Sequence, residues 1–204
     1  MNFALKINSQ ISDLKEEWVN DADFLNEWTS NSLLISKDYR HIKVDSFESD
    51  KNKVWIIGDI IEERTNANDA ATFAVDLNFQ QLFKAIQGHY RVIVFNKESR
   101  SVFAACSLFG ILPVYYIKKA GQVFLSSSLE LLAKQTGELE IDKRFIMENI
   151  LFYYPLFDNT IYKQIKLLPA HHQLKITDAG VNCSRYFNVC NWFTSGLVPW
   201  GKAA

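Results

Sequence analysis

The chain has few cysteines, and they form no recognisable pattern. Its 204 residues include three, Cys106, Cys183 and Cys190. The number is odd and no C-x-x-C pair occurs, so the sequence signals neither a disulfide framework nor a zinc site. We therefore expect buried or incidental thiols and no metal centre.

The chain also lacks long apolar runs and an excess of either charge. No apolar run approaches the ~18 residues of a membrane span, and the start MNFALKINSQ is unlike a signal peptide. The 22 basic residues balance 23 acidic ones without a basic patch that would attract nucleic acid. We expect a cytoplasmic protein that binds neither membrane nor nucleic acid, with a core supplied by its 48% hydrophobic content.

Helical periodicity is present in four segments. The clearest is 12–28, where apolar residues recur at three- and four-residue steps behind a Ser12 cap. The others are 79–87, 129–135 and 142–151. We predict amphipathic helices in all four.

Five segments rich in β-branched and aromatic residues predict strands: 53–61, 89–96, 100–107, 112–117 and 122–128. In Val92, Ile93, Val94 and Phe95 both faces of a strand are apolar, which predicts a sheet covered on both sides. The connections 96–100 and 118–122 are short and polar, as in antiparallel hairpins. The sequence thus predicts an α+β fold in which helices cover the outer faces of a layered sandwich.

A glycine and a proline interrupt the apolar run FAACSLFGILPVYY at 103–116. Gly110 permits a positive φ, and Pro113 fixes its own φ at the entrance of the next strand. Local physics therefore predicts a turn between two strands here.

Two separated blocks resemble the N-terminal domain of asparagine synthetases. The first runs from Gly88 through the Phe-Gly-x-x-Pro-x-Tyr-Tyr segment at 109–116 to a Ser-rich strand and helix at 126–132. The second is TIYKQIKLLPAHHQLKI at 160–176, followed by RYF at 185–187. The resemblance covers about 50–190, and 1–50 match poorly.

The resemblance implies a class II glutamine amidotransferase-like domain over 1–187. Its fold would be that of N-terminal-nucleophile (Ntn) hydrolases, a four-layer αββα sandwich of two antiparallel sheets between helical layers. We expect 188–204 to begin a linker toward a synthetase domain.

In the resembling family, a Cys at the mature N-terminus attacks the glutamine amide and its own α-amine manages the proton. This chain begins with Met1 and Asn2, neither of which offers a thiol or hydroxyl. We therefore expect no catalytic residue, and a degenerate, pseudoenzyme domain.

The substrate pocket also departs from the family pattern. The family's oxyanion-binding Asn-Gly-Glu corresponds to Ile57-Gly58-Asp59, where Ile57 has no donor. The Asp that holds the substrate's α-amine corresponds to the neutral Gln87, before Gly88. The carboxylate-holding Arg is matched to Arg40, in YRHIKVD. These six residues form the expected vestigial pocket.

The turn itself has lost charge. Family members carry a pattern like Ala-Arg-Asp-Arg-Phe-Gly-Ile-Lys-Pro, whereas 105–113 read ACSLFGILP. Gly110 and Pro113 are thus interpreted as scaffold residues that persist without their polar network.

Three other features have plain structural readings. His171 and His172 lack ligands at metal spacing and fit a turn followed by a strand. The acidic residues of 13–23 fit the solvated face of the first helix. The aromatic cluster within 152–157 either packs in the core, the reading we favour, or faces a partner.

Three functions stay open. The first is a non-hydrolysing scaffold of an asparagine synthetase-like ATP-dependent amide ligase. Its partner would be the synthetase domain of the same chain, which would use ATP and Mg²⁺, whereas this segment itself needs no cofactor. A homodimer is also possible. The second is a free-standing module that binds a glutamine-like molecule and ends naturally at residue 204. The third is an amidase with a displaced Cys nucleophile, whose ammonia release would vanish on Cys106→Ala.

Overall fold

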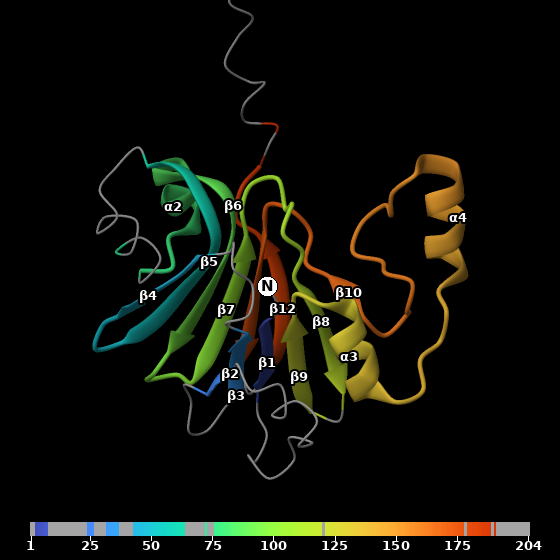
Figure 1. Cartoon of the computed structure of the whole chain (residues 1–204), viewed down its shortest axis with the longest axis horizontal. Coiled ribbons are helices and arrows are strands. Elements are labelled where there is room, and N and C mark those ends of the chain that lie inside the picture. Colours follow the sequence, from blue (N-terminus) through green and yellow to red (C-terminus); the bar gives the residue numbers. More distant parts are fainter. Residues whose placement is uncertain are drawn as a thin grey trace, which may run out of the picture.

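The computed structural model describes two stacked sheets with helices outside them (Figure 1). The residues described are 3–7, 24–26, 32–36, 43–63, 72, 76–119, 121–177, 179–188 and 190.

The first sheet contains the chain's first strand at its centre. Its order is β10 (Lys166–Leu167), β8 (Tyr115–Lys119), β9 (Gln122–Ser126), β1 (Phe3–Ile7), β3 (Ser32–Ser36) and β2 (Phe24–Asn26). The start of β1 is tied to the end of β9, because the Phe3 N–H donates to Ser127 Oγ at 2.9 Å and Ser126 Oγ donates to the Phe3 carbonyl at 2.8 Å.

The second sheet has the order β12 (Gly180–Arg185), β11 (His172–Thr177), β7 (Ser101–Cys106), β6 (Ile86–Asn96), β5 (Asn52–Glu63) and β4 (Val44–Glu48). Strands β6 and β7 form one predicted hairpin, and β8 and β9 form the other. Each strand pair described in the two sheets is antiparallel.

The two faces of β6 pack into different layers, as its sequence predicts. Ile93 and Phe95 belong to the core between the sheets, with Phe3 of β1. Val92 and Val94 belong to a second core on the outer face of the same sheet. Burial on both faces explains the continuous apolar run.

Among the residues that the structure describes, one helix covers each outer face. Helix α2 (Phe79–Ala85) packs Phe79, Leu82 and Phe83 on the second sheet, and α3 (Leu129–Thr136) packs Leu132 on the first. Figure 1 shows α2 and α3 on opposite sides of the sheets. The predicted α+β class and αββα layering are confirmed.

A third helix stands away from both sheets (Figure 1). Helix α4 (Lys143–Phe152) begins at an Asp142 cap, whose carboxylate accepts the Arg144 N–H at 2.9 Å, and it ends at Tyr153 with φ 64°. Most of its apolar residues and several that follow are exposed, and we call these exposed residues the α4 surface: Ile146, Met147, Ile150, Leu151, Phe152, Tyr153, Tyr154 and Phe157. The favoured reading of 152–157 as core is therefore wrong, since Tyr153 is 91% exposed and Phe157 is 74% exposed.

Two helix predictions need correction. Most of 12–28, including its acidic face, lies outside the described residues, but Phe24–Asn26 form β2 because they pair with β3 along the sheet edge. The predicted helix 79–87 ends at Ala85, since Ile86 and Gln87 pair with the end of β5 and lengthen the hairpin.

The remaining boundaries agree to within a few residues, the largest differences being the earlier start of β6 at Ile86 and the later start of β8 at Tyr115. No helix in the described part of the chain is long and apolar enough to cross a membrane.

Candidate functional site

Two glycines allow β5 and β6 to approach closely beside the expected pocket. Gly58 has φ 139° and Gly88 has φ 154°, backbone conformations that side-chain-bearing residues rarely adopt. A Cβ added at Gly58 would collide with the His89 carbonyl, and one added at Gly88 would collide with the Asp59 carbonyl. Both positions thus require glycine for a physical reason that is independent of catalysis.

Ile57 lies on the face of β5 that points into the core between the sheets. It is fully buried there, opposite Arg91 of β6. An apolar side chain at this position supplies packing and offers no hydrogen to an oxyanion.

Arg91 is a buried charge in the same layer. It is 3% exposed, and neither Nε nor Nη1 has a hydrogen-bond partner among the described residues. Its guanidinium lies 5.6 Å from the centroid of the Phe3 ring, and Arg91 pairs with Cys106 on the adjacent strand β7. Burial is the main cause that lowers the pKa of Arg91, to about 10.

The interrupted run at 103–116 turns as predicted. Gly110 has φ 59°, and its N–H donates to the Ser107 carbonyl at 2.8 Å. The Ser107 N–H in turn donates to the Tyr90 carbonyl at 2.9 Å. A Cβ at Gly110 would press on Ala170 at 3.2 Å, so the turn also packs closely against the second resembling block.

The closing RYF segment joins the same region. The Tyr186 ring stacks on Phe83 of α2 with centroids 4.6 Å apart, and its hydroxyl donates to the Cys106 carbonyl at 2.8 Å. The two sequence blocks therefore meet at the end of β7.

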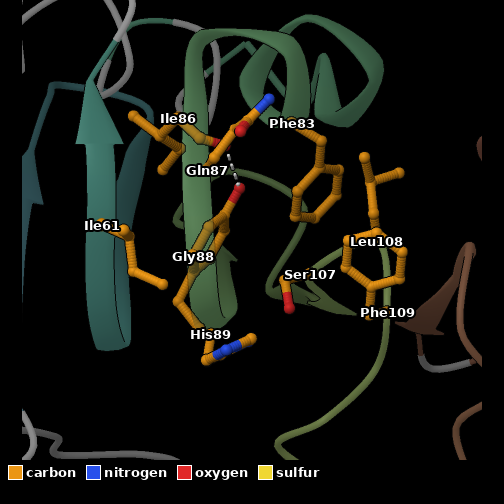
Figure 2. Close-up of a pocket in the computed structure, with 10 residues that line it drawn as sticks. Ile61, Phe83, Ile86, Gln87, Gly88, His89, Ser107, Leu108 and Phe109 are labelled. Atoms are coloured by element: carbon orange, nitrogen blue, oxygen red, sulfur yellow. Dashed lines mark hydrogen bonds between the residues drawn. The ribbon is translucent and has the colours of Figure 1, made fainter.

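A pocket of about 310 Å³ opens beside this meeting point (Figure 2). It is lined by Ile61, Phe83, Ile86, Gln87, Gly88, His89, Tyr90, Ser107, Leu108 and Phe109. Of the six residues expected to form the vestigial pocket, the structure brings only Gln87 and Gly88 to this cavity.

Three of the other expected residues lie elsewhere. Ile57 is in the core, Gly58 pairs with Tyr90, and the exposed Asp59 pairs with His89. Arg40 lies outside the described residues, as do Met1 and Asn2.

The three cysteines differ in environment. Cys106 is fully buried, and that burial raises the pKa of its thiol to about 12 despite the opposing effect of Arg91. Cys183 and Cys190 are exposed, and partial burial of the Cys183 thiol raises its pKa as well. Neither the Cys106 nor the Cys183 environment favours the reactive thiolate.

The predicted turn and strand around the histidine pair are confirmed. His171 has φ 64°, and His172 begins β11 with its Nδ1 2.8 Å from the Ala170 carbonyl oxygen. Among the described residues, no group of three or more His, Cys, Asp or Glu side chains could hold a metal ion.

Comparison with known proteins decides the family. The family model described as "Glutamine amidotransferase domain" matches residues 74–187, which is more than half of the chain. The chain belongs to this family. The match includes α2, the β6–β7 hairpin, the Gly110 turn and the RYF segment.

A curated relative narrows the relationship. The amidotransferase domain is 25% identical over 103 residues to the glutamine-hydrolysing asparagine synthetase 1 of Bacillus subtilis (strain 168). The matched part is 50% of this chain and 16% of that protein. The domain is thus related to asparagine synthetase but spans a small part of its relative's length.

Solved structures give more distant likenesses. One is glutamine phosphoribosylpyrophosphate amidotransferase from B. subtilis, complexed with ADP and GMP, with a TM-score of 0.44 and 9% identity. A structure of the allosteric regulatory enzyme of purine biosynthesis has the same two values. In each case the alignment covers 91% of this chain and 43% of the other.

Sequence reasoning did not single out three residues that the structure makes prominent: His89, Arg91 and Ser107. A signal existed for Arg91, because a charge inside the apolar run HYRVIVF predicts a buried guanidinium. The unpartnered atoms of His89 and Ser107 depend on the three-dimensional arrangement and leave no sequence pattern.

Proposed function

We propose that this chain is a glutaminase-inactive amidotransferase domain that serves as the scaffold of an asparagine synthetase-like, ATP-dependent amide ligase. The observation that supports the proposal is the burial of Ile57 in the core between the sheets, because the sequence resemblance matches Ile57 to the family's oxyanion-donating Asn. Loss of one such donor typically costs roughly 10²- to 10³-fold in rate. The neutral Gln87 adds a second departure, since it carries no charge to hold an α-amine.

The amidase alternative needs a displaced nucleophile, and Cys106 was its candidate. Its thiol is buried and its pKa is raised to about 12, so almost none of it is thiolate at neutral pH. Arg91 is close enough to oppose this shift but does not overcome the effect of burial. The environment of Cys106 therefore supports a structural role.

An electrophilic glutamine analogue tests this part of the proposal. A chloroketone analogue alkylates a thiol that attacks the glutamine carbonyl, and peptide mass spectrometry locates the adduct. We expect slow labelling of the exposed Cys183 and Cys190 that free glutamine does not prevent. Stoichiometric labelling of Cys106 that glutamine blocks would overturn the proposal.

The scaffold role draws support from the α4 surface. Eight large apolar side chains gather on one protruding helix and the residues after it, and a large exposed apolar patch is typical of an interaction site. The segment is held in shape by Glu148, which is 5% exposed and accepts the Leu156 N–H at 2.9 Å and the Arg144 Nε–H at 2.6 Å. An ordered apolar surface of this kind is more favourable when a permanent partner domain covers it than when it contacts water.

We assign this surface to the synthetase domain of the same protein. The related asparagine synthetase extends far beyond the matched part, which is 16% of its length. That domain would supply the ATP and Mg²⁺ chemistry. The first test is to read the gene beyond codon 204 for a Ser-Gly-Gly-x-Asp-Ser loop, which the proposal requires.

A second test addresses the surface directly. If the downstream domain is expressed separately, we expect it to bind this chain and to lose affinity for the double variant Ile150→Asp, Tyr153→Ser. Lys143→Ser, on an exposed residue of the same helix, is the matched control. A homodimer that dissociates in the double variant would show instead that a second copy covers the α4 surface.

A further inference from the structure

The walls of the pocket come from the outer layer of the molecule. Phe83, Ile86 and Tyr90 belong to the core between α2 and the second sheet, with Leu108 packed against it. Ile57, Arg91 and Cys106 face the opposite side of that sheet and do not line the pocket. The cavity therefore lies on the outer side of that sheet, away from Ile57, although Gln87 and Gly88 of the expected pocket line it.

The rim of the pocket is apolar and exposed. Ile61 is 71% exposed and Phe109 is 69% exposed, and both line the cavity. Figure 2 shows them on opposite sides of the pocket, with Gly88 between them in this view. Large apolar side chains at the mouth would lose water contact if a ligand occupied the space between them.

Two polar groups that line the pocket have no hydrogen-bond partner among the residues that the structure describes. Ser107 is 2% exposed, and its Oγ has no hydrogen bond to any described residue. The buried Nδ1 of His89 is likewise unpartnered within the described part of the chain. Figure 2 shows the Ser107 hydroxyl and the His89 ring toward the same lower side of the view.

Such groups are costly when buried without a partner, so their presence in a cavity points to a ligand or water that satisfies them. The Tyr90 hydroxyl differs, because its hydrogen is already donated to the Ile86 carbonyl at 3.0 Å. Among the described lining residues, the buried polar side-chain atoms without a partner are therefore Ser107 Oγ and His89 Nδ1.

The lining carries no formal charge that would select an ion. The described residues around the cavity include no Asp, Glu, Lys or Arg. A zwitterion such as glutamine would leave its ammonium and carboxylate groups unpaired against apolar walls, which is unfavourable. The volume of about 310 Å³ lies at the lower end of the range of small-molecule sites, roughly 300–1,000 Å³.

From these observations we infer that the pocket binds a small uncharged molecule, with an aromatic or branched apolar body and one hydroxyl or carbonyl group that hydrogen-bonds to Ser107 and His89. The site goes beyond the proposed function and does not depend on it. The apolar body occupies the space among Phe83, Leu108 and Phe109.

Two probes of similar shape test this inference: p-cresol, which carries a hydroxyl, and toluene, which lacks one. Titrations of the ¹⁵N-labelled chain would follow the amide signals of 107–109. We expect saturable shifts with both probes, and binding of p-cresol tighter by roughly 2- to 10-fold, the effect of one net hydrogen bond. L-Glutamine should cause no saturable shift there.

Variants assign the effect to the pocket. Ser107→Ala should retain toluene binding and reduce the preference for p-cresol. Ile61→Trp, at the exposed rim, should weaken both probes. Ile111→Ala is the matched control, because Ile111 is exposed on the same turn and does not line the cavity.

Three results would overturn the inference. The first is the absence of saturable shifts with either probe. The second is an unchanged preference for p-cresol over toluene in Ser107→Ala, which would show that Ser107 does not bind the hydroxyl of p-cresol. The third is glutamine binding at 107–109 as tight as that of p-cresol, which would make the cavity an amino-acid site.

Discussion

Substitution of Gly88 by alanine tests the geometry on which both the fold and the pocket depend. Gly88 has φ 154°, and an added Cβ would collide with the Asp59 carbonyl and lie 3.0 Å from the Ile60 Cα. These are backbone atoms of a paired strand, so they cannot move aside as a flexible side chain would. Backbone strain of about 1–3 kcal/mol and overpacking of about 1–3 kcal/mol together predict a loss of about 2–6 kcal/mol in the free energy of unfolding.

The matched control is Gly121→Ala in the β8–β9 turn. Gly121 also has a positive φ, 79°, but an added Cβ would meet no heavy atom within 4 Å. Only the conformational cost remains, about 1–2 kcal/mol. Urea denaturation followed by the fluorescence of tryptophans, including the buried Trp55 of β5, measures both variants. A Gly88→Ala loss no larger than that of Gly121→Ala would refute the close approach of β5 and β6.

Three further substitutions or reagents have defined outcomes. Arg91→Met should stabilise the chain by about 1–2 kcal/mol in thermal or urea unfolding. Burial that lowers the pKa of Arg91 to about 10 destabilises the native state by about 3 kcal/mol at every pH below that value, and the cation–π contact that the variant loses offsets about 0.5–2 kcal/mol of the gain. A variant less stable than the wild type would contradict this prediction. Iodoacetamide should alkylate Cys183 well before Cys106 in the native chain, and the reverse order would refute the buried, protonated Cys106 thiol. Glu148→Gln should speed proteolysis within 143–157 at neutral pH. The hydrogen bond from the Leu156 N–H lowers the pKa of Glu148, so the stabilisation by the Glu148 carboxylate is present above pH 4.5 and is lost as the pH falls below it. Equal cleavage of wild type and variant at pH 7 would contradict the proposed role of Glu148 in holding this segment.

The layering could be predicted because the pattern of apolar residues along each strand shows which of its faces are buried. Val92 to Phe95 alternate between two cores, and the short polar turns at 96–100 and 118–122 leave only antiparallel hairpins. The Gly110 turn could also be predicted from the sequence, since a glycine shortly before a strand that begins with proline typically adopts a positive φ in a turn. Local sequence was enough wherever neighbours in sequence are neighbours in the sheet.

Predictions failed where a long-range partner decides the outcome. Phe24–Asn26 form a strand because β3 is available to pair with them, and Gln87 leaves the predicted helix because β5 extends past it. The aromatic residues of 152–157 have the composition of a core, but α4 stands apart and leaves them exposed. Composition alone does not distinguish a core residue from an interface residue.

The expected pocket residues do not all face one side of the sheet. Gln87 and Gly88 line the cavity on the outer side, whereas Ile57 faces the core between the sheets. Residues adjacent along paired strands can thus face opposite sides, and a motif that spans β5 and β6 does not by itself define one cavity.

The central claim is that this amidotransferase domain does not hydrolyse glutamine. The most direct measurement is the release of ammonia from millimolar L-glutamine by the purified chain and by its Cys106→Ala variant, each compared with buffer alone. The account predicts that both proteins release ammonia at the buffer rate. Release above that rate by the wild-type chain that disappears in Cys106→Ala would contradict it and establish Cys106 as a displaced nucleophile.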